Sequence, residues 1–335
     1  MSRYVLRRLI LMIPVLIGVS MIVFVTMRVL PGDPVRLHLS GTGATEAQIA
    51  EYRRALGLDQ PLTIQYTRYV AGLLRGDLGH SIGFRRPVLS LVLERLPATV
   101  ELGFASLIVA LIVGIPSGVL AARYRNSMVD YTITTLATVG VSLPTFWVGL
   151  ILILVFAVHA QWLPSFGRID DFIELEAWSG LYLLDSLKSR NWVALKSAMA
   201  HLLLPSVALG LSLATFISRL VRSSMLETLA QDYVRTARAK GLPERAVVLA
   251  HAFRNALLPV VTVVGMQLGN LLSGAVVAET VFAWPGLGRL AVDAVYQRDF
   301  TLAQGVVLVF AVIRLGLNLA TDLAYAWIDP RIKYS

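Results

Sequence analysis

The chain has five histidines, no cysteine and many serines, and none of these side chains stands in a catalytic pattern. No two histidines have the His-Glu-x-x-His spacing that places two zinc ligands on one helical face. No serine stands in Gly-x-Ser-x-Gly, which exposes a nucleophile at a turn between strand and helix. The sequence therefore predicts neither a metal site nor a hydrolase.

The glycine-rich segments do not form a nucleotide-binding loop either. The chain lacks Gly-x-x-x-x-Gly-Lys-Ser/Thr, whose backbone N–H groups hold the phosphates of ATP. Residues 286–291, "GLGRLA", lack the third glycine of a dinucleotide-binding loop. We interpret these glycines as a tight loop and expect no cofactor in this chain.

Composition indicates a membrane protein. The chain is 56% hydrophobic and 15% charged, with a mean hydropathy of +0.69, whereas a soluble domain has about 25% charged residues. The net charge of +9 could indicate nucleic acid, but the basic residues cluster beside the apolar segments. We therefore expect a lipid environment and no nucleic acid.

Six apolar segments are long enough to cross a bilayer as helices, which takes about 20 residues each. They are residues 9–27, 102–122, 131–158, 197–218, 255–278 and 302–325, of which the last contains Arg314 and Asp322. Continuous apolarity favours helices, because the strands of a membrane barrel alternate at every second residue. The first segment has no cleavage site after it, which favours a retained span over a signal peptide. The predicted fold class is an all-α membrane protein with six transmembrane helices.

Orientation follows from the distribution of Lys and Arg. With the N-terminus inside, the short inner segments hold fourteen basic residues, and the short outer loop holds only Arg289 and Arg298. Both termini are therefore expected to be cytoplasmic.

These spans predict the domain organisation. An N-terminal transmembrane helix occupies 1–30 and an extracytoplasmic helical insertion 31–97. A five-helix transmembrane domain covers 98–328, with an extracytoplasmic segment at 160–196 and a cytoplasmic loop at 223–256. A cytoplasmic tail, 329–335, completes the chain.

The insertion 31–97 contains two predicted helices. Thr45 as N-cap, Gln48 three residues later and Gly57 as a stop indicate the first. Pro61 in the first turn and Gly76 as a stop indicate the second. Whether this insertion docks a partner or braces the spans is left open by its sequence. The segment 160–196 carries an acidic run, which is either a solvated face or a docking site for a cationic ligand.

The predicted cytoplasmic stretch 231–259 is polar between two apolar spans. Apolar residues from Leu226 to Ala237 recur at helical spacing, Gly241 is a suitable C-cap, and Pro243 starts a second helix. An amphipathic helix here either lies on the lipid headgroups or docks a cytoplasmic partner. The residues alone favour neither.

The same stretch, "DYVRTARAKGLPERAVVLAHAFRNALLPVV", resembles the cytoplasmic signature loop of ABC importer permeases of the peptide branch. Arg235, Thr236 and Ala237 stand where the wider family has Glu-Ala-Ala, and Gly241 is the family's glycine. The segments "LPGDP", "GDLGHSI", "RLPATVELG", "GVSLPTFWVG", "ETVFAWPGLGRL" and "NLATDLAYAWIDPRIK" extend the resemblance over the chain. The length is most similar to the first permease subunit of dipeptide importers.

The resemblance implies a type I ABC importer permease fold and a function in peptide import across a bacterial plasma (inner) membrane. The implied partners are a homologous second permease, two ATPase subunits that bind ATP and Mg, and an extracytoplasmic peptide-binding protein. The helix before Gly241 would couple to an ATPase subunit. The implied coupling residues are Asp232, Tyr233, Arg235, Thr236, Ala237, Arg238, Ala239, Lys240, Gly241 and Leu242.

Further site predictions concern the path and the outer face. Candidate path residues are Gln267, Asn270, Ser273, Phe146 and Trp147, although the small residues around them also suit helix packing, and Pro144 suits a kink. By the resemblance, Trp284, Pro285, Gly286, Leu287 and Gly288 contact the binding protein; simple loop packing is the alternative. The mid-span Arg314 indicates either a functional site or a contact with a partner subunit.

Other functions remain open at this point. A permease of the same family for oligopeptides, glutathione or nickel complexes would carry the same signals. A secondary transporter or channel would need charged residues deep in several spans, and only Arg314 meets that requirement.

Overall fold

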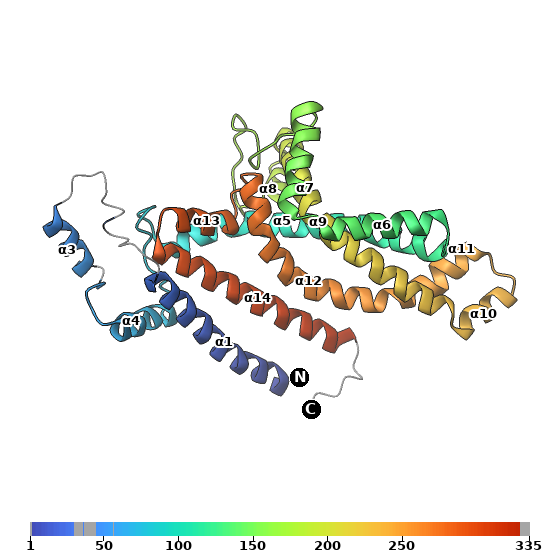
Figure 1. Ribbon diagram of the computed structural model, residues 1–335, viewed down its shortest axis with the longest axis horizontal. Helices are drawn as coiled ribbons and strands as arrows, with labels where there is room; N and C mark the ends of the chain where they lie inside the picture. Colours follow the sequence, from blue (N-terminus) through green and yellow to red (C-terminus); the bar gives the residue numbers. More distant parts are fainter. Residues whose placement is uncertain (1, 30–35, 37–44, 56, 329–335) are drawn as a thin grey trace. The chain divides into compact units, whose positions relative to one another are not determined.

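A computed structural model describes residues 2–29, 36, 45–55 and 57–328 of the chain, and the predicted tail 329–335 lies outside them. These residues are helical apart from turns, loops and one isolated bridge between His80 and Pro87 (Figure 1). They divide into two units. The first contains Met1–Pro97 and Gly286–Leu319, and the second contains Ala98–Pro285 and Ala320–Ile332.

The first unit contains the N-terminal and C-terminal apolar helices. Its elements are α1 (Ser2–Val29), α3 (Glu46–Ala55), α4 (Leu62–Leu74), the start of α5 (Val88–Arg123), α13 (Leu287–Tyr296) and most of α14 (Phe300–Ile328). Val88, Leu287 and Leu302 are fully buried at the centre of its core. Buried Asp299 accepts hydrogen bonds from Ser81 Oγ at 2.5 Å and from Leu302 N at 3.0 Å, which fixes the loop before α5 to the start of α14.

Both helices predicted in 31–97 occur, as α3 and α4. Thr45 N donates to Gln48 Oε1 at 2.8 Å, and Gln48 N donates to Thr45 Oγ1 at 3.4 Å, which is a capping box. Gly57 and Gly76 have φ values of +66° and +77°, which glycine adopts without strain. Pro61 is the N-cap of α4, one position earlier than predicted.

The second unit is built around α9. Its elements are α5 from Ala98 onward, α6 (Met128–Ser142), α7 (Thr145–Leu152), the π-helical η1 (Ile153–His159), α8 (Tyr182–Lys188), α9 (Trp192–Leu229), α10 (Asp232–Ala239), α11 (Glu244–Ala246), the π-helical η2 (Val247–Ala252) and α12 (Phe253–Val281). Helices α6, α7, α8 and α12 all pack on α9. The apolar stretch of α9 is 61% buried, so this helix forms the centre of the unit.

Four of the described helices are long and apolar enough to cross a membrane, and six spans result if each of two bent helix pairs is one span. The predicted third span, 131–158, breaks between α6 and α7, whose axes differ by 106°. Pro144 lacks an N–H and holds Leu143 extended at φ −86° and ψ 127°, so α6 ends there. This break confirms the kinked or broken segment predicted at Pro144.

Glycines let α5 and α9 approach backbone to backbone. A Cβ at Gly114 would lie 2.7 Å from Ala214 O, and one at Gly118 would lie 2.5 Å from Ser218 O. From the other helix, a Cβ at Gly210 would lie 2.6 Å from Ser106 O. Small residues allow such close contacts between membrane helices, where dispersion replaces the hydrophobic effect.

Replacing Gly118 by Ala is expected to destabilise the second unit by about 1–3 kcal/mol, because the added methyl group overpacks the interface with α9. Gly103→Ala is the matched control on the same helix, since a Cβ there would meet nothing within 4 Å. It should be neutral or stabilising by about 0.5–1 kcal/mol. Thermal unfolding of both variants in detergent would test this, and equal effects would contradict the packing argument.

Candidate functional site

The predicted coupling stretch is a helical hairpin made of α10, the turn at Gly241 and α11 (Figure 1). The spacing of the apolar residues from Leu226 to Ala237 predicted one continuous helix, but these residues belong to two helices. Helix α9 ends at Leu229, and Gln231 is extended at φ −72° and ψ 151° before α10 begins. After Gly241 the chain continues through α11 and η2 into α12, and the helix axis bends by 42° between Glu244–Leu257 and Pro259–Gly265.

One face of α10 is fixed to the chain's own core. Val234 and Val247 are fully buried, Ala237 is 6% exposed, and Leu229 packs against this cluster. Asn255 Nδ2 also donates to Tyr233 Oη at 2.8 Å. This face of α10 is therefore attached to the segment that leads into α12.

A charge pair closes the turn of the hairpin. Arg238 donates to both carboxylate oxygens of Glu244, at 3.1 and 2.7 Å. These hydrogen bonds raise the pKa of the Arg238 guanidinium above its ordinary value, against a smaller lowering by burial. Between the two residues Gly241 has φ +76°, and a Cβ there would meet nothing within 4 Å. A larger residue at Gly241 would thus cost only the backbone strain, about 1–2 kcal/mol.

The other face of the hairpin is open. Ala237 is the only buried member of the predicted coupling residues, and the side chains of Asp232 and Arg235 are 94% and 73% exposed. Tyr233 and Leu242 add partly exposed apolar surface. The buried side chains of α10, Val234 and Ala237, face the chain's own core. The surface left for a partner is mixed, with charged groups and two apolar side chains.

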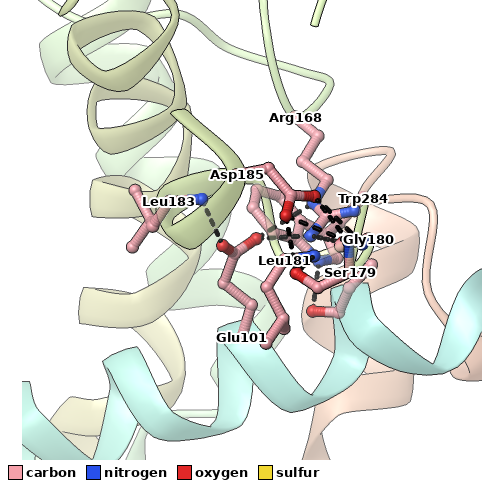
Figure 2. A network of polar contacts seen from close by, with 9 residues as sticks. Glu101, Arg168, Ser179, Gly180, Leu181, Leu183, Asp185 and Trp284 are labelled. Atoms are coloured by element: carbon pink, nitrogen blue, oxygen red, sulfur yellow. Dashed lines mark hydrogen bonds and ion pairs between the residues drawn. The ribbon is translucent and has the colours of Figure 1, made fainter. Parts of the chain in front are cut away.

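Sequence reasoning missed a second polar group, which joins α5 to the segment before α9 (Figure 2). Arg168 and Glu101 form an ion pair with side chains only 6% exposed. Arg168 donates from Nε and Nη2 to Glu101 Oε2 at 3.0 and 2.5 Å, and from Nη2 to Gly180 O at 2.7 Å. The second oxygen of Glu101 accepts from Leu183 N at 2.8 Å. One carboxylate on α5 thus organises two parts of the segment before α9.

The rest of this segment is fixed in the same way. Buried Asp185 accepts from Ser179 Oγ at 2.7 Å and from Gly180 N at 3.0 Å. Trp284 is 1% exposed, and its Nε1 donates to Ala98 O at 2.9 Å (Figure 2). Asp170, the first residue of the acidic run, accepts from Ser197 Oγ at 2.6 Å. The remaining acidic residues of that run, Asp171, Glu174 and Glu176, are exposed.

The predicted path residues lie in different surroundings. Trp147 lines an apolar cavity of about 470 Å³ between α5, α6, α7 and α9, whose polar lining is Ser117, Ser212, Thr215 and Ser218. Phe146, which precedes Trp147 in the sequence, is 48% exposed. Gln267 is half-buried on α12, and the side chains of Asn270 and Ser273 lie outside the described part of the structure. The cavity brings Trp147 together with hydroxyl groups that the sequence had not singled out.

The residues predicted to contact a binding protein are mostly buried within the chain. Trp284, Gly286, Leu287 and Gly288 are buried, and Pro285 is half-buried. Their assignment to a partner stays a prediction. Arg314 has an exposed side chain on α14.

Comparison with known proteins decides the family. Residues 114–334 match the model of the binding-protein-dependent transport system inner membrane component, and residues 1–103 match the model of its N-terminal region. The chain belongs to this family. As a member of it, the chain is a multi-pass component of the inner membrane and an ABC importer permease.

Relatives match along their full lengths. The dipeptide transport system permease protein DppB of Escherichia coli (strain K12) is 44% identical over 340 residues, which are 100% of this chain and 99% of that protein. The glutathione transport system permease protein GsiC of Salmonella paratyphi A is 42% identical over 334 residues, 100% of both chains. A solved chain of the MetNI methionine ABC transporter superposes with a TM-score of 0.55 at 18% identity, covering 71% of this permease and 96% of that chain. The type I ABC importer fold expected from the sequence is therefore confirmed.

Replacing Arg168 by Met is expected to destabilise this permease by about 3–5 kcal/mol, because it leaves the Glu101 carboxylate buried without its cation. Adding Glu101→Gln should restore part of that loss. The control is Arg86→Met, since the Arg86–Glu94 pair has side chains 52% and 49% exposed and should contribute less than about 1 kcal/mol. Denaturant unfolding and protease cleavage within 160–181 would measure the effect. Equal losses for Arg168→Met and Arg86→Met would contradict it.

Proposed function

We propose that this permease forms, with a homologous second permease, the path by which dipeptides or other short peptides cross the plasma membrane. Full-length identities of 42–44% to dipeptide and di/tripeptide permeases of Escherichia coli, Alkalihalophilus pseudofirmus and Pseudomonas aeruginosa support this substrate class. Two partner ATPase subunits bind ATP and Mg, and an extracytoplasmic binding protein delivers the peptide. This chain contributes the path and the coupling surface.

The two-sided hairpin is the observation that carries the mechanism. Its buried face ties α10 to Val247, at the start of the η2 segment that continues into α12. Its exposed face presents Asp232, Arg235 and Lys240 to the solvent. A partner that binds the exposed face and displaces α10 therefore also displaces the start of α12. The motion produced when the ATPase pair closes would be transmitted to the transmembrane helices through α10 and α12.

The apolar cavity beside Trp147 is the part of the chain that we assign to the path. It is open along helices α5, α6, α7 and α9 and carries four hydroxyl groups in an apolar wall. Such a wall offers few strong contacts, which suits a permease that releases its substrate rather than retaining it. The 106° bend between α6 and α7 shapes this wall, so a change of the bend would change the cavity.

Arg235→Glu is expected to abolish the stimulation of ATP hydrolysis by loaded binding protein, because it reverses a charge on the exposed face of α10 without touching the core. Arg125→Glu is the matched control, since Arg125 is also exposed and lies in the turn between α5 and α6. The measurement is ATP turnover and peptide uptake by the reconstituted complex, with subunit assembly checked by gel filtration.

Normal stimulation in the assembled Arg235→Glu complex would show that α10 is an interfacial helix and not a coupling element. A loss of stimulation in both variants would point to the overall surface charge instead of the hairpin.

Glutathione is the second candidate substrate, because the glutathione permease GsiC is as similar to this chain, at 42%, as two of the peptide permeases. Glutathione is itself a short peptide, so the two substrates differ in size and charge rather than in chemical class. Oligopeptides and nickel complexes are further alternatives within the family.

Uptake of a radiolabelled dipeptide by proteoliposomes is expected to exceed that of glutathione by about tenfold or more when each is supplied with its own binding protein. About 1.4 kcal/mol of discrimination corresponds to that ratio. The permease must be the same preparation in both assays, so that only the delivered substrate differs. Equal uptake of both would mean that the permease accepts any short peptide, and preferred uptake of glutathione would overturn the dipeptide assignment.

A further inference from the structure

A polar cavity in the first unit has no place in the transport mechanism above. It has a volume of about 220 Å³ and lies between the end of α1, helix α4, residues 77–79 and the start of α14. Its polar lining consists of Arg28, Gln65, Arg68, Tyr69, Asp77, Thr301 and Gln304. Because one water molecule needs only about 15 Å³ on this measure, the cavity has room for a larger ligand.

Two buried polar atoms in this lining have no hydrogen-bond partner among the residues that the structure describes. Gln304 is 4% exposed, and its Nε2 makes no hydrogen bond; the Tyr69 hydroxyl is likewise buried without one. Among the described residues they are two of only four such side-chain atoms, and both line the same small cavity. Buried polar groups are nearly always paired, so this pair of unsatisfied groups indicates a ligand that supplies acceptors.

The charge of the lining indicates the sign of that ligand. Arg28 Nε donates to Gln65 Oε1 at 2.9 Å, and Arg28 Cζ lies 3.6 Å from the centroid of the Phe24 ring. These two contacts orient the guanidinium group. Arg68 adds a second guanidinium, and Asp77 is the only carboxylate among the described residues of the lining. Asp77 Oδ1 already accepts from Gly79 N at 2.8 Å. The site therefore carries a net positive charge.

The Tyr69 hydroxyl is a donor throughout the physiological range. Burial raises the pKa of Tyr69 to about 12, with a further rise from Tyr66 and a smaller opposing effect from Arg28. The phenol thus keeps its proton, and its O–H can donate a hydrogen bond to an acceptor on a ligand. Together with the guanidinium groups and the amide of Gln304, it offers donors from several directions.

We propose that this cavity binds a phosphoryl oxyanion. Planar guanidinium groups pair with phosphate oxygens through two parallel hydrogen bonds, and a phosphate has enough acceptor oxygens to satisfy the hydroxyl and the amide as well. Arg28 lies in the last turn of α1, whose stretch Leu6–Val29 is long and apolar enough to cross a membrane. The cavity therefore lies where such a span leaves the hydrocarbon, the level at which lipid phosphates are found. An anionic phospholipid headgroup is the expected source, and free phosphate is the other.

The test uses the full-length chain in nanodiscs of phosphatidylglycerol and phosphatidylethanolamine, followed by native mass spectrometry of the retained lipid. Tyr69→Phe, which removes one oxygen, and Arg28→Gln should each lower retained phosphatidylglycerol by about tenfold or more, the value of one lost charge-assisted hydrogen bond. Arg75→Gln is the matched control, because Arg75 is exposed at the end of the same helix as Tyr69 and lies outside the cavity lining. It should retain as much lipid as the wild type.

A second arm separates the two sources of phosphate. Isothermal titration of the delipidated chain in detergent with inorganic phosphate measures free-ion binding directly. If phosphate binds to the wild type but not to Arg28→Gln, while phosphatidylglycerol retention is equal in all proteins, the site binds free phosphate and the oxyanion assignment holds. If Tyr69→Phe and Arg28→Gln match Arg75→Gln in both arms, the proposal is wrong and the cavity holds only water.

Discussion

Direct contact between the backbones of α5 and α9 is the constraint on which the second unit depends. At Gly114, Gly118 and Gly210 a single added carbon would collide with a backbone oxygen of the other helix. Ser117 Oγ also donates to Ser218 Oγ at 2.9 Å within the same contact. With α5 so close on one side, α9 is left to receive α6, α7, α8 and α12 on its other faces. Packing of this kind replaces the hydrophobic effect inside a membrane, where lipid is as apolar as the core.

Ion pairs that involve a buried carboxylate fix the segments that join these helices. Glu101 and Arg168 hold the chain before α9, and Asp130 accepts from Arg222 at 2.6 and 2.7 Å where α6 begins. A buried pair adds little net stability, because both charges lose their hydration. An arrangement that separates the two partners is costly, however, so each pair selects one geometry of the adjoining loop. Residues 160–181, which contain no helix or strand, are specified in this way.

The hairpin combines a fixed side with an open side. Because Val234 and Val247 are fully buried together, the exposed charges of α10 stand on a rigid base. The π-helical segment η2 links that base to α12. Wider helical turns of this kind are frequent at functional sites, where they allow local adjustment. The proposed transmission of motion from an ATPase to the spans depends on this combination of a firm attachment and an adaptable link.

Sequence by itself determined the class of the fold and the outline of the hairpin. Long apolar segments, the capping pair Thr45 and Gln48, the break at Pro144 and the turn at Gly241 all follow from local rules, because each depends on neighbouring residues and on the backbone. The resemblance in the signature loop then indicated the family, which the comparisons established.

Tertiary structure decided what depends on partners distant in sequence. The pairing of Glu101 with Arg168 could not be predicted, since 67 residues separate them and a charge at the end of a span usually faces water. The same is true of the inward direction of Val234 and the burial of Trp284, both set by residues brought close only by folding. The break at Gln231 was missed because apolar spacing continues across it, and periodicity does not register a single extended residue. Local chemistry thus fixed the elements of this permease, and long-range packing decided which of their faces were left for partners.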